Sequence, residues 1–205
     1  IFMIFVLPVF CITGILINFF TAFVIKYYKK DLKDKFHSYM ALGAQFNLIY
    51  CLIYLTNFIN ECIGNKVFCS SVYNTIGAQY YKIYVIIYLG TSLKIGSSLT
   101  YLMFNINRYV LIGKEHVNFL IKLSEVPYYK MRRYIISLSL IFSLLKIFQF
   151  KINFDNETNE YPDLNGLNGS KSFDNKKTTH IFAFLIVVFI HELFVYFVFS
   201  FLNLI

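Results

Sequence analysis

Charged residues are scarce in this chain and tryptophan is absent. Asp, Glu, Lys and Arg make up 15% of the 205 residues, whereas an ordinary soluble domain carries roughly 25%. The chain therefore lacks the polar surface that folding in water requires. The net charge of +8 would suggest a nucleic-acid partner in a soluble protein, but most basic residues here lie in short loops between apolar runs. These features exclude a soluble globular protein and predict a membrane protein that binds no nucleic acid.

Residue groupings typical of catalysis or metal binding are also missing from the sequence. The four histidines lie in separate segments, at His37, His116, His180 and His191. No cysteine or carboxylate spacing beside them suggests a zinc site. The glycine-containing stretch 165–169 is not followed by the Lys-Ser/Thr pair of a phosphate-binding loop. We expect neither an enzyme nor a bound cofactor.

Long apolar runs are the dominant feature of the chain. A helix needs about 20 apolar residues to cross a hydrocarbon core roughly 30 Å thick. The runs are continuous and do not alternate in polarity, which favours helices over barrel strands. The predicted spans are residues 1–28, 38–60, 80–112, 130–151 and 180–205. The sequence thus predicts an all-α fold, a polytopic transmembrane helix bundle that forms a single domain over residues 1–205.

The orientation of the spans follows from charge and from glycosylation sequons. Most basic residues lie in or beside the predicted loops 29–37 and 113–129, and short basic loops stay in the cytosol. The predicted loops 61–79 and 152–179 are then outside. The second of them carries sequons at Asn156 and Asn168, and such sites are used on the outer side. We expect a plasma-membrane glycoprotein whose chain starts outside and ends in the cytosol.

A short motif, Asn107-Arg108-Tyr109, closes the third predicted span on its cytosolic side. An arginine at such a place can simply anchor the helix at the interface by reaching toward the headgroups. The position of this triplet favours a more specific interpretation. It ends the third helix of a bundle that starts outside, and a basic loop follows it.

With this motif the chain resembles the rhodopsin-like seven-helix receptors coupled to G proteins, whose third helix ends in Asp-Arg-Tyr or a variant. Arg108 matches the family's arginine, which holds the inactive state and later helps to receive the G protein, and Asn107 replaces the acid. Asn18 and Asn47 resemble polar packing positions of the first two helices. Tyr196 resembles the fifth-helix tyrosine that meets the arginine on activation.

The chain lacks several features of that family, which restricts the resemblance to a divergent group within it. The chain has no tryptophan for the fourth helix, no proline in the fifth, and no cysteine after Cys69. With the Tyr- and Phe-rich composition, these departures look like the divergent chemosensory serpentine receptors of nematodes. The resemblance implies that the five spans are the first five of seven. It also implies a heterotrimeric G protein as partner and an unknown small-molecule or peptide ligand.

Lys94 is the most unusual residue within the spans. A lysine at the centre of a span costs about 2.5–3.5 kcal/mol, and such residues usually face a cavity or an opposite charge. Glu192, with His191 beside it, sits at a similar depth in the fifth span. Our hypothesis is that Lys94 faces the bundle interior, where it pairs with Glu192 or meets an acidic group of the ligand.

Two cysteines, Cys62 and Cys69, fall in the first outer loop, which is an oxidising location. They could form a local disulfide or remain as two free thiols, and the sequence leaves both alternatives open.

Two other functions remain open beside the receptor. A transporter or channel subunit would use Lys94 and Glu192 to line a polar path. Transporters often contain helices broken by glycine or proline, and the prolines here, Pro8, Pro127 and Pro162, lie away from the span centres. The third alternative is a truncated membrane protein that does not signal.

Overall fold

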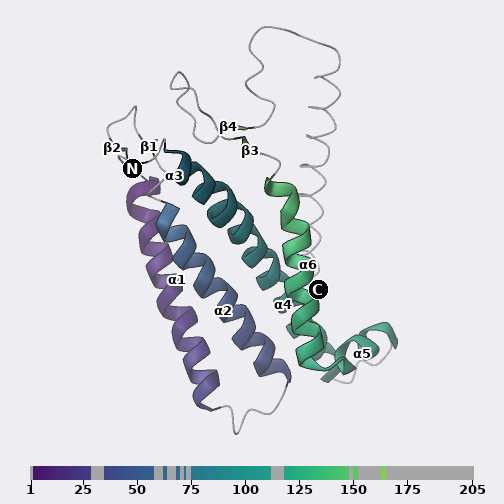
Figure 1. The fold of residues 1–205 in the computed structure, drawn as a ribbon. Coiled ribbons are helices and arrows are strands. Elements are labelled where there is room, and N and C mark those ends of the chain that lie inside the picture. The colour runs from purple at the N-terminus through teal and green to yellow at the C-terminus, as the bar shows by residue number, and fades with distance from the viewer. Residues whose placement is uncertain are drawn as a thin grey trace, which may run out of the picture.

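A computed structural model gives a structure that is almost entirely helical (Figure 1). It describes residues 2–28, 35–57, 62–63, 68–69, 72, 75–111, 118–147, 150–151 and 163–164. Helices long and apolar enough to cross a membrane are Val6–Tyr27, Lys35–Leu55 and Ile76–Leu111. The prediction of a helical protein with apolar helices of membrane-spanning length is therefore confirmed for the described part of the chain.

The first two helices, α1 (Phe2–Tyr27) and α2 (Lys35–Leu55), run in opposite directions and pack against each other (Figure 1). Gly14 lies at their close approach, since a Cβ built on it would be only 2.8 Å from the sulfur of Cys51. Small residues at such points let helix backbones approach closely in lipid. Much of α1 turns large apolar side chains outward, and Phe10 and Phe20 are 67% and 60% exposed. In water a face of this kind would promote aggregation, whereas in a bilayer it meets the lipid tails.

The next helix is continuous from Ile76 to Leu111, and we call it the rod. It is built of three segments. They are α3 (Ile76–Tyr81), the π-helical segment η2 (Lys82–Leu89) and α4 (Gly90–Leu111). The hydroxyl oxygen of Thr75 caps its start by accepting a 3.3 Å hydrogen bond from the backbone N–H of Ala78. Half of its most apolar stretch is buried, so this rod lies at the centre of the described bundle. π-Helical turns are rare and frequently mark functional sites.

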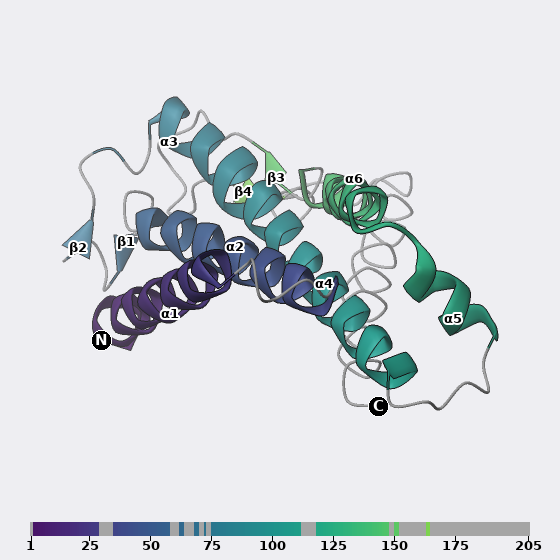
Figure 2. The same ribbon diagram turned by 90° about the horizontal axis from the view of Figure 1, so that it is seen from below.

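The chain continues through a short helix, α5 (Asn118–Glu125), into α6 (Tyr128–Ile147). Pro127 stands just before α6, where its fixed φ and missing N–H suit a helix start. Its carbonyl accepts hydrogen bonds from the N–H groups of Lys130 and Met131, at 3.0 and 3.1 Å. Viewed from below, α1, α2, α4 and α6 follow one another in a curved row, with α5 projecting to one side (Figure 2).

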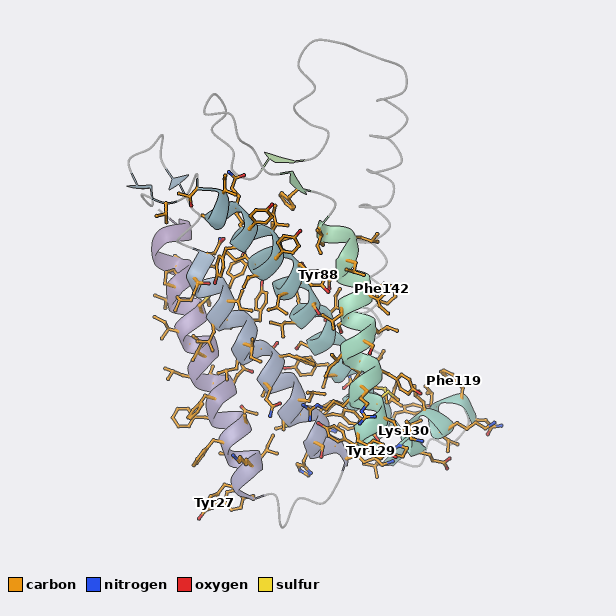
Figure 3. The ribbon with its side chains drawn as sticks, in the orientation of Figure 1. Tyr27, Tyr88, Phe119, Tyr129, Lys130 and Phe142 are labelled. Carbon is orange, nitrogen blue, oxygen red and sulfur yellow. The ribbon has the colours of Figure 1, made fainter. Side chains whose placement is uncertain are left out.

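Two pairs of very short antiparallel strands lie at one end of the bundle, which we call the hairpin end (Figure 1). β1 (Cys62–Ile63) pairs with β2 (Phe68–Cys69), and β3 (Phe150–Lys151) pairs with β4 (Asp163–Leu164). The opposite end carries α5, and we call it the α5 end. Figure 3 shows Tyr27, Phe119 and Tyr129 at the α5 end, where they are 72%, 69% and 57% exposed.

A buried apolar cluster joins α2, α4 and α6 in the half of the bundle nearer α5. Tyr39 and Ile95 are its most buried members, at 1% and 0% exposure. Leu120 and Leu123 of α5 pack against the cluster, which fixes that short helix to the bundle. The other buried members are Leu99, Met103, Ile106, Met131 and Ile135.

Comparison with the predicted spans shows where sequence and structure differ. α1, α2, the rod Ile76–Leu111 and α6 occupy most of the first four predicted spans. However, α6 is not among the helices that are apolar enough to cross, because Lys130, Arg132, Arg133 and Lys146 all fall within it. The predicted inner loop 113–129 contains α5, which forms where Leu120 and Leu123 pack against the buried cluster. The fifth predicted span, 180–205, lies outside the described residues.

Candidate functional site

Arg108 stands near the last turn of α4, at the α5 end, and its side chain is exposed. Its guanidinium carbon lies 5.3 Å from the ring centroid of Phe36 in α2 and 5.6 Å from that of Phe104. These two rings stack on each other with centroids 4.2 Å apart. Arginine binds aromatic faces through cation–π attraction. The aromatic pair therefore holds Arg108 at the junction of α2 and α4 while leaving it accessible.

The other two residues of the triplet occupy different environments. Asn107 is 7% exposed, and its Nδ2 donates a 2.7 Å hydrogen bond to the carbonyl of Met103 one turn back. A neutral amide satisfied within its own helix cannot hold the neighbouring arginine by charge. Tyr109 is partly buried.

At the same end of the bundle, Lys35 of α2 joins α2 to the end of α5. Lys35 Nζ donates to the carbonyls of Ser124, Glu125 and Val126, at 2.8, 3.1 and 3.3 Å. This ammonium group closes the end of α5, where carbonyl groups have no partner within the helix. Besides Arg108, the exposed charged residues described at this end include Lys26, Lys122, Lys130, Arg132 and Arg133, together with the acid Glu125, and Figure 3 labels Lys130 there.

A small polar network lies between α2 and α4, midway along the bundle. Ser97 Oγ donates a 2.7 Å hydrogen bond to Asn47 Oδ1, and Asn47 Nδ2 donates a 3.0 Å bond to the hydroxyl of Tyr101. Asn18 behaves differently, since its Nδ2 donates to the carbonyl of Gly14 within α1, at 2.7 Å. Of the two asparagines selected from the sequence, Asn47 therefore joins two helices and Asn18 bonds within its own.

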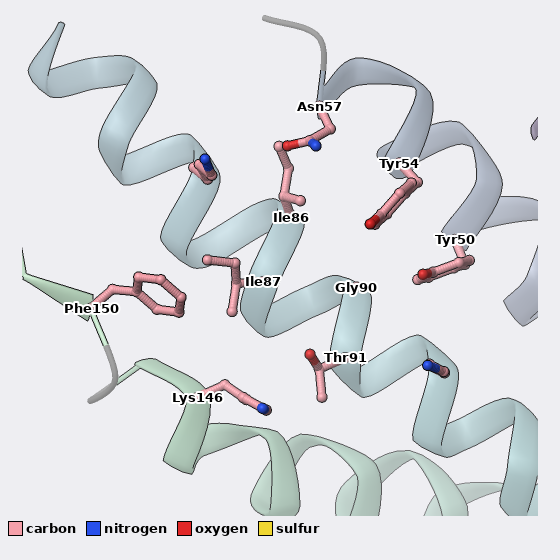
Figure 4. Close-up of a pocket in the computed structure, with 11 residues that line it drawn as sticks. Tyr50, Tyr54, Asn57, Ile86, Ile87, Gly90, Thr91, Lys146 and Phe150 are labelled. Carbon is pink, nitrogen blue, oxygen red and sulfur yellow. The ribbon is translucent and has the colours of Figure 1, made fainter. Parts of the chain in front are cut away.

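A cavity with a volume of about 370 Å³ opens among α2, η2, α4 and α6 toward the hairpin end (Figure 4). Lys94 lines it, together with Lys82 of η2 and Lys146 of α6. The remaining lining residues are Tyr50, Tyr54, Asn57, Ile86, Ile87, Gly90, Thr91 and Phe150. Lys94 thus lines a cavity to which two further lysines contribute, but its side chain is exposed rather than enclosed within the bundle.

Those two lysines carried a signal in the sequence. Like Lys94, Lys82 and Lys146 stand within long apolar runs, where a charge is costly and usually functional. What the sequence could not show is that the three lysines line the same cavity.

Several predicted residues lie where the structure describes little or nothing. His191, Glu192, Tyr196, Asn156 and Asn168 are outside the described residues. For the two outer-loop cysteines the backbone is described, and the register places Cys62 directly opposite Cys69 across the β1–β2 pair.

Comparison of the chain with protein-family models, curated proteins and solved structures finds no match. Function must therefore be argued from the arrangement of the residues.

Proposed function

We propose that the chain is a helical membrane receptor of chemosensory type that transmits ligand binding outside the cell to a G protein. The observation that carries this proposal is the placement of Arg108. It is an exposed arginine in the last turn of the central helix, at the end of the bundle where Lys122, Lys130, Arg132 and Arg133 are also exposed.

Membrane insertion is supported by the outward-facing surface of the bundle. Three helices have the length and apolarity to cross a bilayer. Exposed aromatic residues such as Tyr27, Phe119 and Tyr129 gather at the α5 end, which matches the aromatic belts at membrane interfaces. In this proposal α6 is the fourth span and residues 180–205 are the fifth. The basic residues near the start of α6 then lie at the cytosolic headgroups.

The rod made of α3, η2 and α4 provides a direct physical link between the two ends. Lys94 lines the cavity and Arg108 stands fourteen residues further along the same helix, or about 21 Å at 1.5 Å per residue. A ligand shifts a conformational equilibrium only if it binds one state more tightly than the other. A ligand that changes how the rod packs against α2 and α6 would therefore change the surface around Arg108.

A transporter is the second candidate, because a cavity lined by lysines suits a path for anions. The packing of the described residues weighs against it. Below the cavity, Tyr39, Ile95 and Leu99 are at most 8% exposed and fill the space between α2, α4 and α6. A binding site closed by a packed core fits a receptor better than a path through the bundle.

The receptor proposal is tested by measuring proximity between the full chain and a panel of Gα subunits in cells, with energy transfer between fused reporters. We expect a signal above that of an unrelated membrane protein for at least one Gα class, and we expect Arg108→Ala to abolish it. Arg133→Ala is the matched control, since Arg133 is another exposed arginine at the same end. Equal signals from the two variants at equal surface expression would contradict the proposal.

A further inference from the structure

The short helix α5 packs on the side of the bundle and projects beyond it. Figure 1 shows α5 at a wide angle to the long helices, and Figure 2 shows it outside the row formed by α1, α2, α4 and α6. Leu120 and Leu123 pack against the buried cluster. The ammonium group of Lys35 bonds to three carbonyls at the end of the helix. These contacts hold α5 in one position at the α5 end.

The outer side of α5 carries an apolar side chain that the described helices do not cover. Phe119 is 69% exposed, and Figure 3 shows it on the side of α5 that faces the hairpin end. Tyr129, near the start of α6, is exposed at the same end of the bundle. When the long helices cross a bilayer, Phe119 points into the edge of the hydrocarbon region, the depth at which aromatic belts lie.

Basic side chains accompany these aromatic rings. Lys122 of α5 and Lys130 and Arg132 of α6 are exposed. The only acid in the sequence from residue 118 to residue 132 is Glu125, so this stretch has a net positive charge. Helices that lie in the plane of a membrane combine Phe or Leu on the lipid side with Lys or Arg on the polar side. The composition and the placement of α5 both fit a helix at the lipid headgroups.

We propose that α5 and the start of α6 bind the headgroups of anionic phospholipids. The α5 surface, as we call it, consists of Phe119, Lys122, Tyr129, Lys130 and Arg132. Phe119 inserts into the lipid, while the three cations bind phosphate and carboxylate groups of the headgroups.

Charge complementarity selects this partner. Each basic residue near an anionic membrane surface strengthens the attraction about fivefold, the equivalent of about 1 kcal/mol. The inference goes beyond the proposed receptor function and does not depend on it, since it requires only that the bundle spans a bilayer.

The absence of tryptophan from the chain supplies the means of measurement. Phe119→Trp places a single fluorophore in the full chain, at an exposed position that already holds an aromatic ring. The variant is reconstituted in nanodiscs of phosphatidylcholine and phosphatidylserine. The lipid composition is kept constant, and bromine atoms are placed either on the acyl chains of phosphatidylserine or on those of an equal amount of phosphatidylcholine. Bromine quenches tryptophan only at short range, so the quenching reports which lipid lies beside position 119.

We expect the probe at position 119 to emit as in an apolar environment and to be quenched more strongly by the brominated phosphatidylserine. The local preference for phosphatidylserine should be about fivefold or more at low salt. It should decrease as salt is added, because the screening length falls to roughly 3 Å at 1 M. Phe10→Trp is the matched probe, since Phe10 is 67% exposed on α1 within an uncharged run. Both brominated lipids should quench it equally.

The cations are tested in the Phe119→Trp chain by combining Lys122→Gln, Lys130→Gln and Arg132→Gln. All three side chains are exposed, so the bundle should still fold. The preference for phosphatidylserine should fall to nearly one, while the emission of the probe stays that of an apolar environment. The matched control combines Lys122→Arg, Lys130→Arg and Arg132→Lys, which changes the same side chains, retains their charge and should retain the preference.

Two results would overturn the inference. The first is a probe at position 119 that iodide quenches from solution and neither lipid quenches, which would assign the α5 surface to a soluble protein partner instead. The second is equal quenching by the two brominated lipids at low salt, or a preference that the three glutamines leave unchanged. No G protein is present in the nanodiscs, so failure here does not bear on the coupling assay.

Discussion

Ser97 of α4 donates a 2.7 Å hydrogen bond to the side-chain oxygen of Asn47 in α2. The amide nitrogen of Asn47 donates in turn to the Tyr101 hydroxyl, at 3.0 Å. The two bonds fix the rotation of α2 relative to α4 between the cavity and the packed core. These bonds can also transmit a change in the packing of α2 on α4 from the hairpin end to the α5 end.

The Asn47–Ser97 bond should contribute measurably to stability. In a double-mutant cycle, Asn47→Leu and Ser97→Ala should show a coupling energy of about 0.5–1.5 kcal/mol, the range found for hydrogen bonds between membrane helices. Reversible unfolding in mixed micelles measures it. Strictly additive effects of the two substitutions would show that the bond stabilises nothing.

Gly96 lies where α4 comes close to two neighbours. A Cβ there would be 3.1 Å from Cε2 of Phe46 and 3.2 Å from the hydroxyl oxygen of Ser139, which is buried in α6. Overpacking costs about 1–3 kcal/mol and the helix gains about 0.8–1.0 kcal/mol when alanine replaces glycine, so Gly96→Ala should destabilise the bundle by up to about 2 kcal/mol. Thermal unfolding checks this.

The control is Gly77→Ala, since a Cβ at Gly77 meets nothing within 4 Å. Alanine favours the helix over glycine by about 0.8–1.0 kcal/mol, so this variant should be as stable as the wild type or more so. Equal melting temperatures of Gly96→Ala and Gly77→Ala would contradict the close approach of Phe46 and Ser139 to Gly96.

Cys62 and Cys69 should form a disulfide in the mature protein. They are directly opposite each other in the β1–β2 register, and opposite residues in an antiparallel pair have Cα atoms about 4.5–5.5 Å apart. That separation lies within the range that a disulfide bridges, roughly 4.4–6.8 Å. Mass spectrometry without reduction should find one peptide two hydrogens lighter than its reduced form. Alkylation of both thiols in the untreated protein would contradict this.

The parts of the fold that follow from the sequence are those set by length and polarity alone. A run must be about 20 apolar residues long to cross a bilayer, and the uncharged stretch 2–25 that forms most of α1 can be seen in the sequence. The helix α5 was missed, because it is only eight residues long and lies in a basic segment. Its apolar face is recognisable only once Leu120 and Leu123 are seen against the core.

The sequence predicts individual residues of the candidate site, but it does not predict which of them lie together. Lys94 stood out because one charge in an apolar run is costly. Its grouping with Lys82 and Lys146 depends on how η2, α4 and α6 are rotated, which no local pattern specifies. Phe36 likewise meets Arg108 through the packing of α2 on α4.

The α5 end should face the cytosol and the hairpin end the outside, because the proposed G protein and the proposed ligand require this orientation. Glycosylation mapping in cells tests this most directly. A chain with Asn156→Gln and Asn168→Gln serves as the unglycosylated background, and a sequon is introduced either within residues 64–67 or within an enlarged segment 112–117. We expect a glycosidase-sensitive mass shift for the first sequon and none for the second. A sugar on segment 112–117 would contradict this orientation.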